Sequence, residues 1–341
     1  MDIATINQKY IDLENDEYQV EGLLKKRIEP SAYCNLFLAV EKPSNKRFFL
    51  LEVKTQSISS DINLPQSKGF EVITLIIKPG INGKVYLILK LTELSFREVF
   101  SVLVQDLIDY ISKQTNENEG INSFISRLNR WKAFFQNFSV NGLSEPEQLG
   151  LFTELWFLYN FLLNNVGISK AILGWTGPNG TNQDFQLGSC AVEVKSSIGS
   201  PHEKIMVSNV RQLDLTGLSS LILYYAAFDS RQNGILSLPK LIEQMRTLIM
   251  SKDDNFLINF NEKLRDSGYL DIHENLYLKN KYTLRHQYFF QVGDGFPRIL
   301  ENDLLKGVGD VKYSIMISSC MQYQIGEMTA LNIIKGMAEN D

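Results

Sequence analysis

The chain has 341 residues, of which 44% are hydrophobic and 21% are charged; this is enough apolar material for a large core and excludes wholesale disorder. Its net charge of -5 counts against a protein that coats nucleic acid, although a basic cleft can be local. The sequence has no run of about 18 apolar residues that would predict a membrane span, and Cys34, Cys190 and Cys320 form no CxxC pair, which argues against a zinc site or a disulfide framework and favours a reducing cytoplasm.

The first part of the chain predicts a β-rich domain, which we place at 1–115. Apolar or alternating stretches are separated there by turn-rich breaks. The strand candidates are 35–40, 47–53, 70–77 and 84–91. Residues 96–111 have the period of an amphipathic helix, the stretch 114–120 is polar, and 121–138 return to a helical period. We therefore expect a helical connector at 116–143.

The pattern changes at Ser144, which has capping-box spacing with Glu147 and should begin a helix that runs to about Asn164. Three strands, a short helix near Ser208 and a fourth strand should follow. The strand candidates are 183–187, 190–197, 203–208 and 221–228. Further helices are predicted at 238–250 and 255–267, and further strands at 282–291 and 312–319. For 144–341 we expect an α/β (α+β) domain, with a mixed central sheet flanked by helices and a C-terminal extension.

Residues 182–195 can form a hairpin that brings charged side chains together. Gly188-Ser189 fits a two-residue type II′ turn, because glycine suits the first turn position. In that register Asp184 faces Glu193, with Cβ atoms roughly 4.5–5.5 Å apart. Lys195 lies two residues beyond Glu193 and therefore shares its face of the sheet.

Two carboxylates and an ammonium on one face predict chemistry on a phosphate. Opposed carboxylates destabilise a hairpin unless a hard divalent cation lies between them, and oxygen ligands of this kind suit Mg²⁺. Such an ion polarises a phosphate and lowers the pKa of a bound water, and a lysine stabilises developing negative charge. The alternative is that Asp184 caps a turn while Glu193 and Lys195 line a solvated strand face.

The chain contains a second copy of the Glu-Val-Lys motif, at 52–54. No acid opposes this copy from a preceding hairpin strand. We therefore interpret Glu52 and Lys54 as part of a solvated face, and the pairing with Asp184 as the feature that distinguishes the copy at Glu193.

Glu154 is the only acid in the nearly all-apolar helical stretch 149–163. Such a helix should be mostly buried, and a buried carboxylate is unfavourable unless it is paired or binds a metal. Glu154 is either part of a buried ion pair, or a solvent-facing residue, or a further ligand aimed at Asp184 and Glu193.

Weaker candidates surround this centre. Gln212 could face the site from the start of the helix near Ser208, or it is an ordinary exposed helix residue. Ser196 could contact a phosphate, or it is a loop residue; the same holds for Ser197, His202 and Lys204. The cationic residues of the predicted helix at 121–138 form either a contact with a nucleic-acid backbone or a solvated face: Arg127, Arg130 and Lys132.

At this point the residues resemble a known superfamily. Asp184, a hairpin and Glu193-Val194-Lys195, preceded by a helical Glu154, resemble the PD-(D/E)XK nuclease signature, and the order of elements resembles its restriction-endonuclease-like core. More narrowly, the chain resembles a bacterial family of PD-(D/E)XK motif proteins whose genes lie beside restriction-modification or phage-defence genes. The segments that carry this resemblance are 150–155, 175–178, 184–185 and 192–197. One departure is Gln183, which stands in place of the signature proline.

The resemblance implies a Mg²⁺-dependent endodeoxyribonuclease, with Mn²⁺ as a substitute. By matching positions, Asp184, Glu193 and Glu154 would bind the metal and Lys195 would be catalytic. The implied partners are DNA, a methyltransferase or ATPase encoded nearby, and a second copy of the chain, since cutting both strands commonly takes two centres. The alternatives are a nuclease-like binding or assembly module of a defence complex, and a nuclease for RNA or branched DNA. The opposed carboxylates favour the nuclease, because a binding module does not need them.

Overall fold

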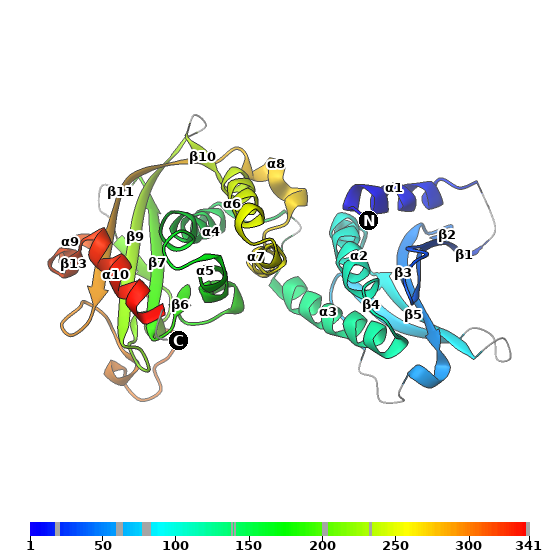
Figure 1. The fold of residues 1–341 in the computed structure, drawn as a ribbon, viewed down its shortest axis with the longest axis horizontal. Helices are drawn as coiled ribbons and strands as arrows, with labels where there is room; N and C mark the ends of the chain where they lie inside the picture. Colours follow the sequence, from blue (N-terminus) through cyan, green and yellow to red (C-terminus); the bar gives the residue numbers. More distant parts are fainter. Residues whose placement is uncertain are drawn as a thin grey trace. The chain divides into compact units, whose positions relative to one another are not determined.

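The computed structural model describes residues 1–17, 21–58, 64–76, 83–137, 139, 141–199, 204–231 and 234–338. The chain divides into two compact units, Met1–Val140 and Asn141–Asp341 (Figure 1). This division falls inside the stretch that the sequence predicted as a connector, while the predicted extents of the domains stay a prediction.

The first unit packs helices on one face of an antiparallel sheet. The strands, in spatial order, are β1 (Gly22–Ile28), β2 (Asn35–Lys42), β3 (Lys46–Lys54), β5 (Lys84–Leu91) and β4 (Phe70–Ile76). The helices are α1 (Ile3–Glu14), α2 (Arg97–Ile111) and α3 (Glu117–Asn137). Alternate residues of the strands turn towards the helices, so that Phe49 of β3 stacks on Phe124 of α3. The four predicted strands and the helix after them are confirmed, whereas α1 was not predicted.

The helix α3 differs from its prediction in two ways. It begins at Glu117, inside the polar stretch 114–120 and before the helical period predicted from residue 121. Arg127 is buried against α2, where its Nε and Nη2 donate to the Asp106 carboxylate at 2.9 and 2.7 Å. The Trp131 indole donates to the same carboxylate. Arg127 is therefore neither a nucleic-acid contact nor part of a solvated face. The prediction failed because the sequence does not show that its acidic partner lies on another helix.

The second unit is built on a mixed sheet. Its spatial order is β10 (Leu236–Ser237), β11 (Lys281–Val292), β9 (Ser220–Arg231), β7 (Cys190–Ile198) and β6 (Phe185–Leu187), with β13 (Gln324–Ile325) also paired to β11. The strands β7 and β9 are parallel, and the other pairs are antiparallel. The predicted mixed sheet flanked by helices is confirmed, and the fold class is α/β (α+β).

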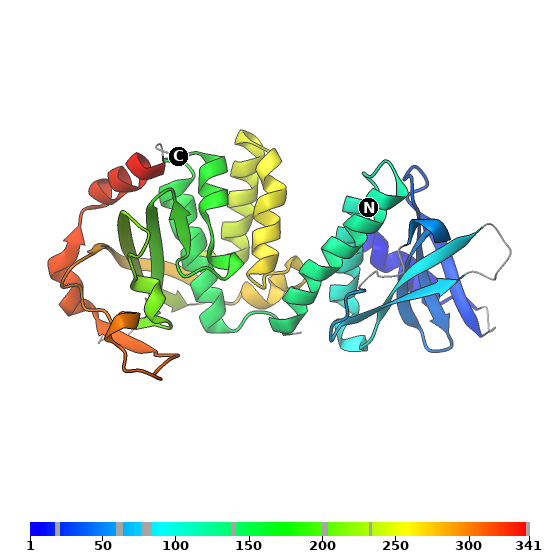
Figure 2. The ribbon, with the colours of Figure 1, turned by 90° about the horizontal axis from the view of Figure 1, so that it is seen from below.

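Helices cover one face of this sheet. They are α4 (Glu145–Phe157), α5 (Ile168–Gly174), α6 (Leu238–Lys252), α7 (Asn255–Asp266), α8 (Glu274–Tyr277) and α10 (Glu327–Ala338); α4 to α7 lie together on one side of the strands (Figure 2). As predicted, α4 begins with a capping box, in which the Ser144 backbone N–H donates to Glu147 at 2.8 Å. A π turn, Leu158–Leu162, continues α4 to nearly the predicted end.

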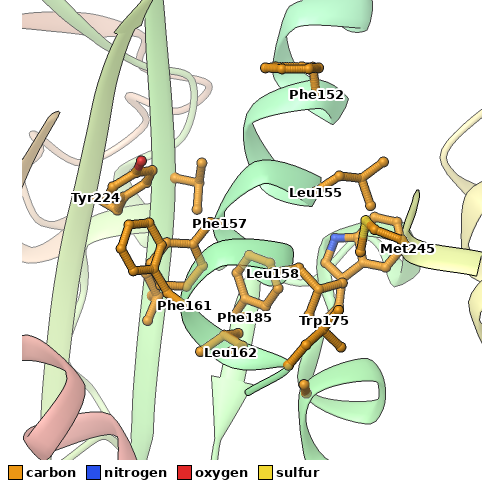
Figure 3. Packing of buried hydrophobic residues seen from close by; sticks show 14 of the residues in the cluster. Phe152, Leu155, Phe157, Leu158, Phe161, Leu162, Trp175, Phe185, Tyr224 and Met245 are labelled. Atoms are coloured by element: carbon orange, nitrogen blue, oxygen red, sulfur yellow. The ribbon is translucent and has the colours of Figure 1, made fainter. Parts of the chain in front are cut away.

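The core of the second unit lies between α4 with its π turn and the sheet. Phe157 contacts Phe185 and Tyr224, with ring centroids 5.2 and 4.9 Å apart (Figure 3). Each large apolar side chain buried in this way contributes roughly 1.5–3 kcal/mol of hydrophobic stabilisation. The apolar run in α4 is thus explained by its burial, and it fixes the helix against β7.

Three predictions for this unit need correction. The third predicted strand forms as β8 (Lys204–Val207), but it pairs with β12 (Tyr313–Met316) in a separate two-stranded sheet. The short helix near Ser208 is a single 3-10 turn, Val210–Leu213. The strand predicted at 312–319 ends at Met316 and continues as the short helix α9 (Ile317–Cys320), because Ile317 and Cys320 turn into the core at helical spacing.

None of the helices in the described part of the chain is long and apolar enough to cross a membrane. The three cysteines, Cys34, Cys190 and Cys320, are free and buried.

Candidate active site

The β6–β7 hairpin forms in the predicted register. Leu187 pairs with Cys190, Gln186 with Ala191 and Phe185 with Val192. Gly188 has φ 61°, the positive value that the first position of a type II′ turn requires. The two-residue turn at Gly188-Ser189 is therefore confirmed.

Asp184 reaches the site in a different way from the predicted cross-strand pair. Pairing stops at Phe185, one residue after Asp184, while β7 runs on to Ile198. The edge of β7 beyond Val192 thus has no strand partner among the described residues on the β6 side. The Val194 backbone N–H at this edge donates to Asp184 Oδ2 at 2.7 Å. The Asp184 carboxylate consequently lies at the edge of the sheet, where side chains from either face of the sheet can come close to it.

Glu193 is a buried carboxylate whose charge is only partly balanced by neighbouring groups. Its side chain is fully buried. Oε1 lies 2.7 Å from Lys195 Nζ and forms an ion pair with it. Oε2 accepts no hydrogen bond from the described residues. A buried charged oxygen without a donor is unfavourable, so this atom is available to a cation.

Lys195 is held by two groups. Besides Glu193, its Nζ donates to Gln212 Oε1 at 3.1 Å. Gln212 lies in the 3-10 turn after β8, and its Oε1 also accepts from the Ser208 backbone N–H at 3.0 Å. The structure therefore brings the predicted accessory residue Gln212 to the ammonium. The lysine is fixed on the same face as Glu193, as the alternation of β7 predicted.

Glu154 lies in α4, which packs on the sheet face opposite to Glu193 and Lys195. Its Oε2 accepts a hydrogen bond of 2.7 Å from the indole Nε1 of Trp175, and its side chain keeps some contact with solvent. An added Cβ at Gly177 would lie 3.0 Å from Glu154 Oε2 and 3.2 Å from Asp184 Oδ1. The two carboxylates therefore border the same small space.

The electrostatics of the site reflect three acids and one base in a confined place. Burial raises the pKa of Glu193 and of Glu154 well above the usual range, and the nearby Asp184 raises both further. Burial also raises the pKa of Asp184, against the opposing effects of Lys195 and the Val194 N–H. Burial lowers the pKa of Lys195, but the carboxylates of Glu193, Asp184 and Glu154 outweigh it, and the net shift is upward. The site favours an added positive charge.

The remaining serine, lysine and histidine candidates lie around this centre. Ser196 follows Lys195 in β7 and so lies on the opposite face, the one against which α4 packs. The Ser197 hydroxyl is 2.6 Å from the Tyr225 hydroxyl. Lys204 is exposed at the start of β8, and His202 lies outside the described residues. Phosphate contacts by these side chains stay a prediction.

Two residues of the site were not assigned a role from the sequence: Trp175 and Gly177. Both belong to the segment 175–178, which contributed to the family resemblance but was given no part in the site. The available signal was a buried type of side chain, tryptophan, next to a glycine in an otherwise polar loop. It did not show which carboxylates the loop would contact, because Glu154 lies 21 positions before Trp175 and Asp184 lies seven positions after Gly177.

The second Glu-Val-Lys copy lies in different surroundings. Glu52 accepts from Lys84 Nζ and Asn35 Nδ2 at 2.7 Å each and from the Tyr86 hydroxyl at 3.1 Å. The interpretation as a solvated face is therefore correct for the exposed Lys54 but wrong for Glu52, which is half-buried and fully paired. In register Glu52 faces Asn35 and Tyr86, so no acid opposes it across either neighbouring strand.

The site residues fit a divalent cation, although they are not preassembled around one. As the side chains stand, the described residues contain no group of three His, Cys, Asp or Glu that forms a ready set of metal ligands. The donors are nevertheless hard carboxylate oxygens, which suit Mg²⁺ or Mn²⁺. Glu193 Oε2 has no donor, and Glu154 and Asp184 border a common space.

A family model described as "Putative PD-(D/E)XK family member, (DUF4420)" matches residues 6–318. This range covers most of the chain, and the protein belongs to that family. The match extends over both units, well beyond the segments around the site. No curated protein and no solved structure gave a match. The PD-(D/E)XK assignment predicted from the residues is confirmed, and with it a nuclease-type family.

Proposed function

We propose that this protein is a metal-dependent endonuclease that hydrolyses phosphodiester bonds of DNA. The observation that carries the proposal is Glu193, a fully buried carboxylate whose Oε2 has no donor. It lies in a centre that contains two further acids and one lysine. A neutral binding surface does not require such an arrangement, whereas a divalent ion removes its unfavourable electrostatics.

Each residue has a distinct role in this proposal. Asp184, Glu193 and Glu154 would hold the ion, which when bound would polarise the phosphate and lower the pKa of the attacking water. Lys195, fixed by Gln212, offers its ammonium to the phosphate oxygens as negative charge develops on them. The water oxygen bonds to phosphorus and gives up a proton to solvent while the bond to one ester oxygen breaks, and that ester oxygen takes a proton from solvent as it leaves.

We also propose a biological setting and an oligomeric state. The family resemblance supports action within a restriction-modification or phage-defence system, beside a methyltransferase or an ATPase. Cutting of both strands would take two copies of the site, so a homodimer on DNA is the arrangement we propose.

The test is an assay of the purified full-length protein on closed circular plasmid, linear duplex, branched DNA and RNA. Each substrate is incubated with Mg²⁺, with Mn²⁺ or with a chelator. We expect nicking or linearisation of DNA in either metal and none with the chelator. Cleavage of RNA alone would replace the substrate. Absence of cleavage on every substrate, also with the neighbouring gene products added, would favour the binding or assembly module instead.

A further inference from the structure

The loop between α5 and β6 contacts both Glu154 and Asp184. Its Trp175 forms a β-bridge with Phe185, the first residue of β6. The backbone N–H groups of Thr176 and Gly177 both donate to the Asp184 carbonyl, at 2.8 and 2.9 Å. The loop is therefore attached to the very residue whose carboxylate caps the open edge of β7.

The Trp175 indole is a rigid hydrogen-bond donor to Glu154. The side chain is fully buried beside Leu155 and Met245 (Figure 3), and its Nε1 lies 2.7 Å from Glu154 Oε2. The buried ammonium of Lys263 in α7 donates to the Trp175 backbone carbonyl. An indole fixed at its backbone and its ring selects one orientation of the carboxylate. Oε2 faces the indole in that orientation, and Oε1 is left for another partner.

Gly177 leaves room where any side chain would intrude. A Cβ at this position would approach Glu154 Oε2 to 3.0 Å and Asp184 Oδ1 to 3.2 Å. The φ of Gly177 is not positive, so alanine is compatible with its backbone. Glycine is therefore not needed here for the turn. What its missing side chain preserves is the space between two carboxylates.

We propose that Trp175 and Gly177 are positioning residues of the metal centre. Trp175 orients Glu154 through the indole N–H, and Gly177 keeps open the space into which Glu154 and Asp184 direct their oxygens towards the ion. This inference rests on the proposed function, because it assigns the two residues to the binding of that same ion. Groups that orient metal ligands in this way typically affect metal affinity by about 10- to 100-fold.

A purely structural role makes a different prediction. If Trp175 only filled the core, its replacement would lower the stability of the metal-free protein and leave the affinity of the folded protein for Mn²⁺ unchanged. If Gly177 only completed a turn, alanine would shift the loop without a specific effect on the ion. Metal affinity and metal-free stability therefore have to be measured on the same variants.

The first variant is Trp175→Phe, which removes the indole N–H and keeps an aromatic ring. Its matched control is Trp131→Phe in the first unit, where the indole also donates to a buried carboxylate, that of Asp106, at 2.9 Å. Mn²⁺ binding is measured by titration calorimetry without DNA, and unfolding of the metal-free protein by thermal denaturation. We expect Trp175→Phe to bind Mn²⁺ about 10- to 100-fold more weakly than the wild type and Trp131→Phe to bind it equally.

The second variant is Gly177→Ala, which removes no contact and adds one methyl group. Its control is Gly150→Ala in α4, where an added Cβ meets no atom within 4 Å. We expect Gly177→Ala to weaken Mn²⁺ binding at least about tenfold, with a metal-free unfolding transition close to that of the wild type. Gly150→Ala should bind like the wild type.

The outcomes separate this inference from the proposed function. Wild-type Mn²⁺ affinity in both Trp175→Phe and Gly177→Ala, together with loss of binding in Asp184→Asn, would overturn the positioning role and leave the metal centre standing. If the wild type binds no Mn²⁺, or Asp184→Asn binds as tightly as the wild type, both the proposed function and the inference are wrong. If Trp175→Phe does not fold, Gly177→Ala decides alone.

Discussion

The chain contains the tripeptide Glu-Val-Lys twice, on a strand of each unit, and the two copies behave in opposite ways. At 52–54 the glutamate accepts hydrogen bonds from Lys84, Asn35 and Tyr86. At 193–195 the glutamate is more deeply buried, has one close cation and lies near two other carboxylates. The same three residues thus form a satisfied structural pair in one unit and an electrostatically unfavourable centre in the other. The residues around the motif, and not the motif itself, decide whether its glutamate has a structural or a chemical role.

The pKa values express the same contrast. Burial alone would raise the pKa of Glu52, but hydrogen bonds from Lys84, Asn35 and Tyr86 outweigh it and lower the pKa. Burial raises the pKa of Glu193, and Asp184 raises it further. One glutamate therefore stabilises the fold when it is ionised, and the other destabilises it until a cation is bound.

The largest expected difference between the two copies is in catalysis. Lys195→Met should reduce DNA cleavage about 10²- to 10³-fold, because an ammonium that stabilises the transition state is lost. Lys54→Met, the matched change at an exposed position, should cleave at the wild-type rate. Single-turnover rates on plasmid DNA measure both. Equal losses in the two variants, or full activity in Lys195→Met, would remove the distinction between the copies.

A second difference concerns the stability of the metal-free protein near pH 8. Glu193→Gln should raise the free energy of unfolding by about 1–3 kcal/mol, because a buried and poorly compensated charge is removed. Glu52→Gln should lower it by about 0.5–1 kcal/mol, since a half-buried pair with the partly exposed Lys84 is lost. Urea denaturation in the presence of a chelator measures both changes. Effects of the same sign in the two variants would contradict the account.

The dependence of stability on pH sharpens this difference. The folded-state pKa of Glu193 is above its unfolded value of about 4.5, so the native state binds more protons, and the contribution of Glu193 to stability falls as the pH rises above that value towards the folded pKa. Glu52 has the opposite sign: its contribution is present above about pH 4.5 and is lost as the pH falls through its lowered pKa. Denaturation of the metal-free variants from pH 8 down to about pH 3, each compared with the wild type, should show opposite slopes, that of Glu193 above about pH 4.5 and that of Glu52 below it.

The smallest expected effect is that of Gln212→Ala. Its Oε1 accepts from Lys195, while Glu193 still holds the ammonium. We expect cleavage to fall by about tenfold or less, which corresponds to one hydrogen bond to a charged group, and Mn²⁺ affinity to change little. A loss as large as that of Lys195→Met would make Gln212 part of the reaction itself rather than a support for the lysine.

Much of this arrangement could be predicted from the sequence because it depends on local patterns. The Gly188-Ser189 turn and the alternation of residues set the register of β6 and β7, and the apolar run around Glu154 predicted a buried helix. Contacts between distant segments could not be predicted in this way. The open edge of β7, to which Asp184 bonds, arises because β6 begins only at Phe185, after Asp184. The Trp175 indole and the space at Gly177 likewise depend on how α5, β6 and α4 pack together.

The central claim is that Glu193, unlike Glu52, belongs to a divalent-ion site. The most direct test counts bound Mn²⁺ by the loss of the electron paramagnetic resonance signal of the free ion, in the wild type, Glu193→Gln and Glu52→Gln. The account predicts saturable binding in the wild type and in Glu52→Gln, and its loss in Glu193→Gln. Undiminished binding in Glu193→Gln, or none in the wild type, would contradict it.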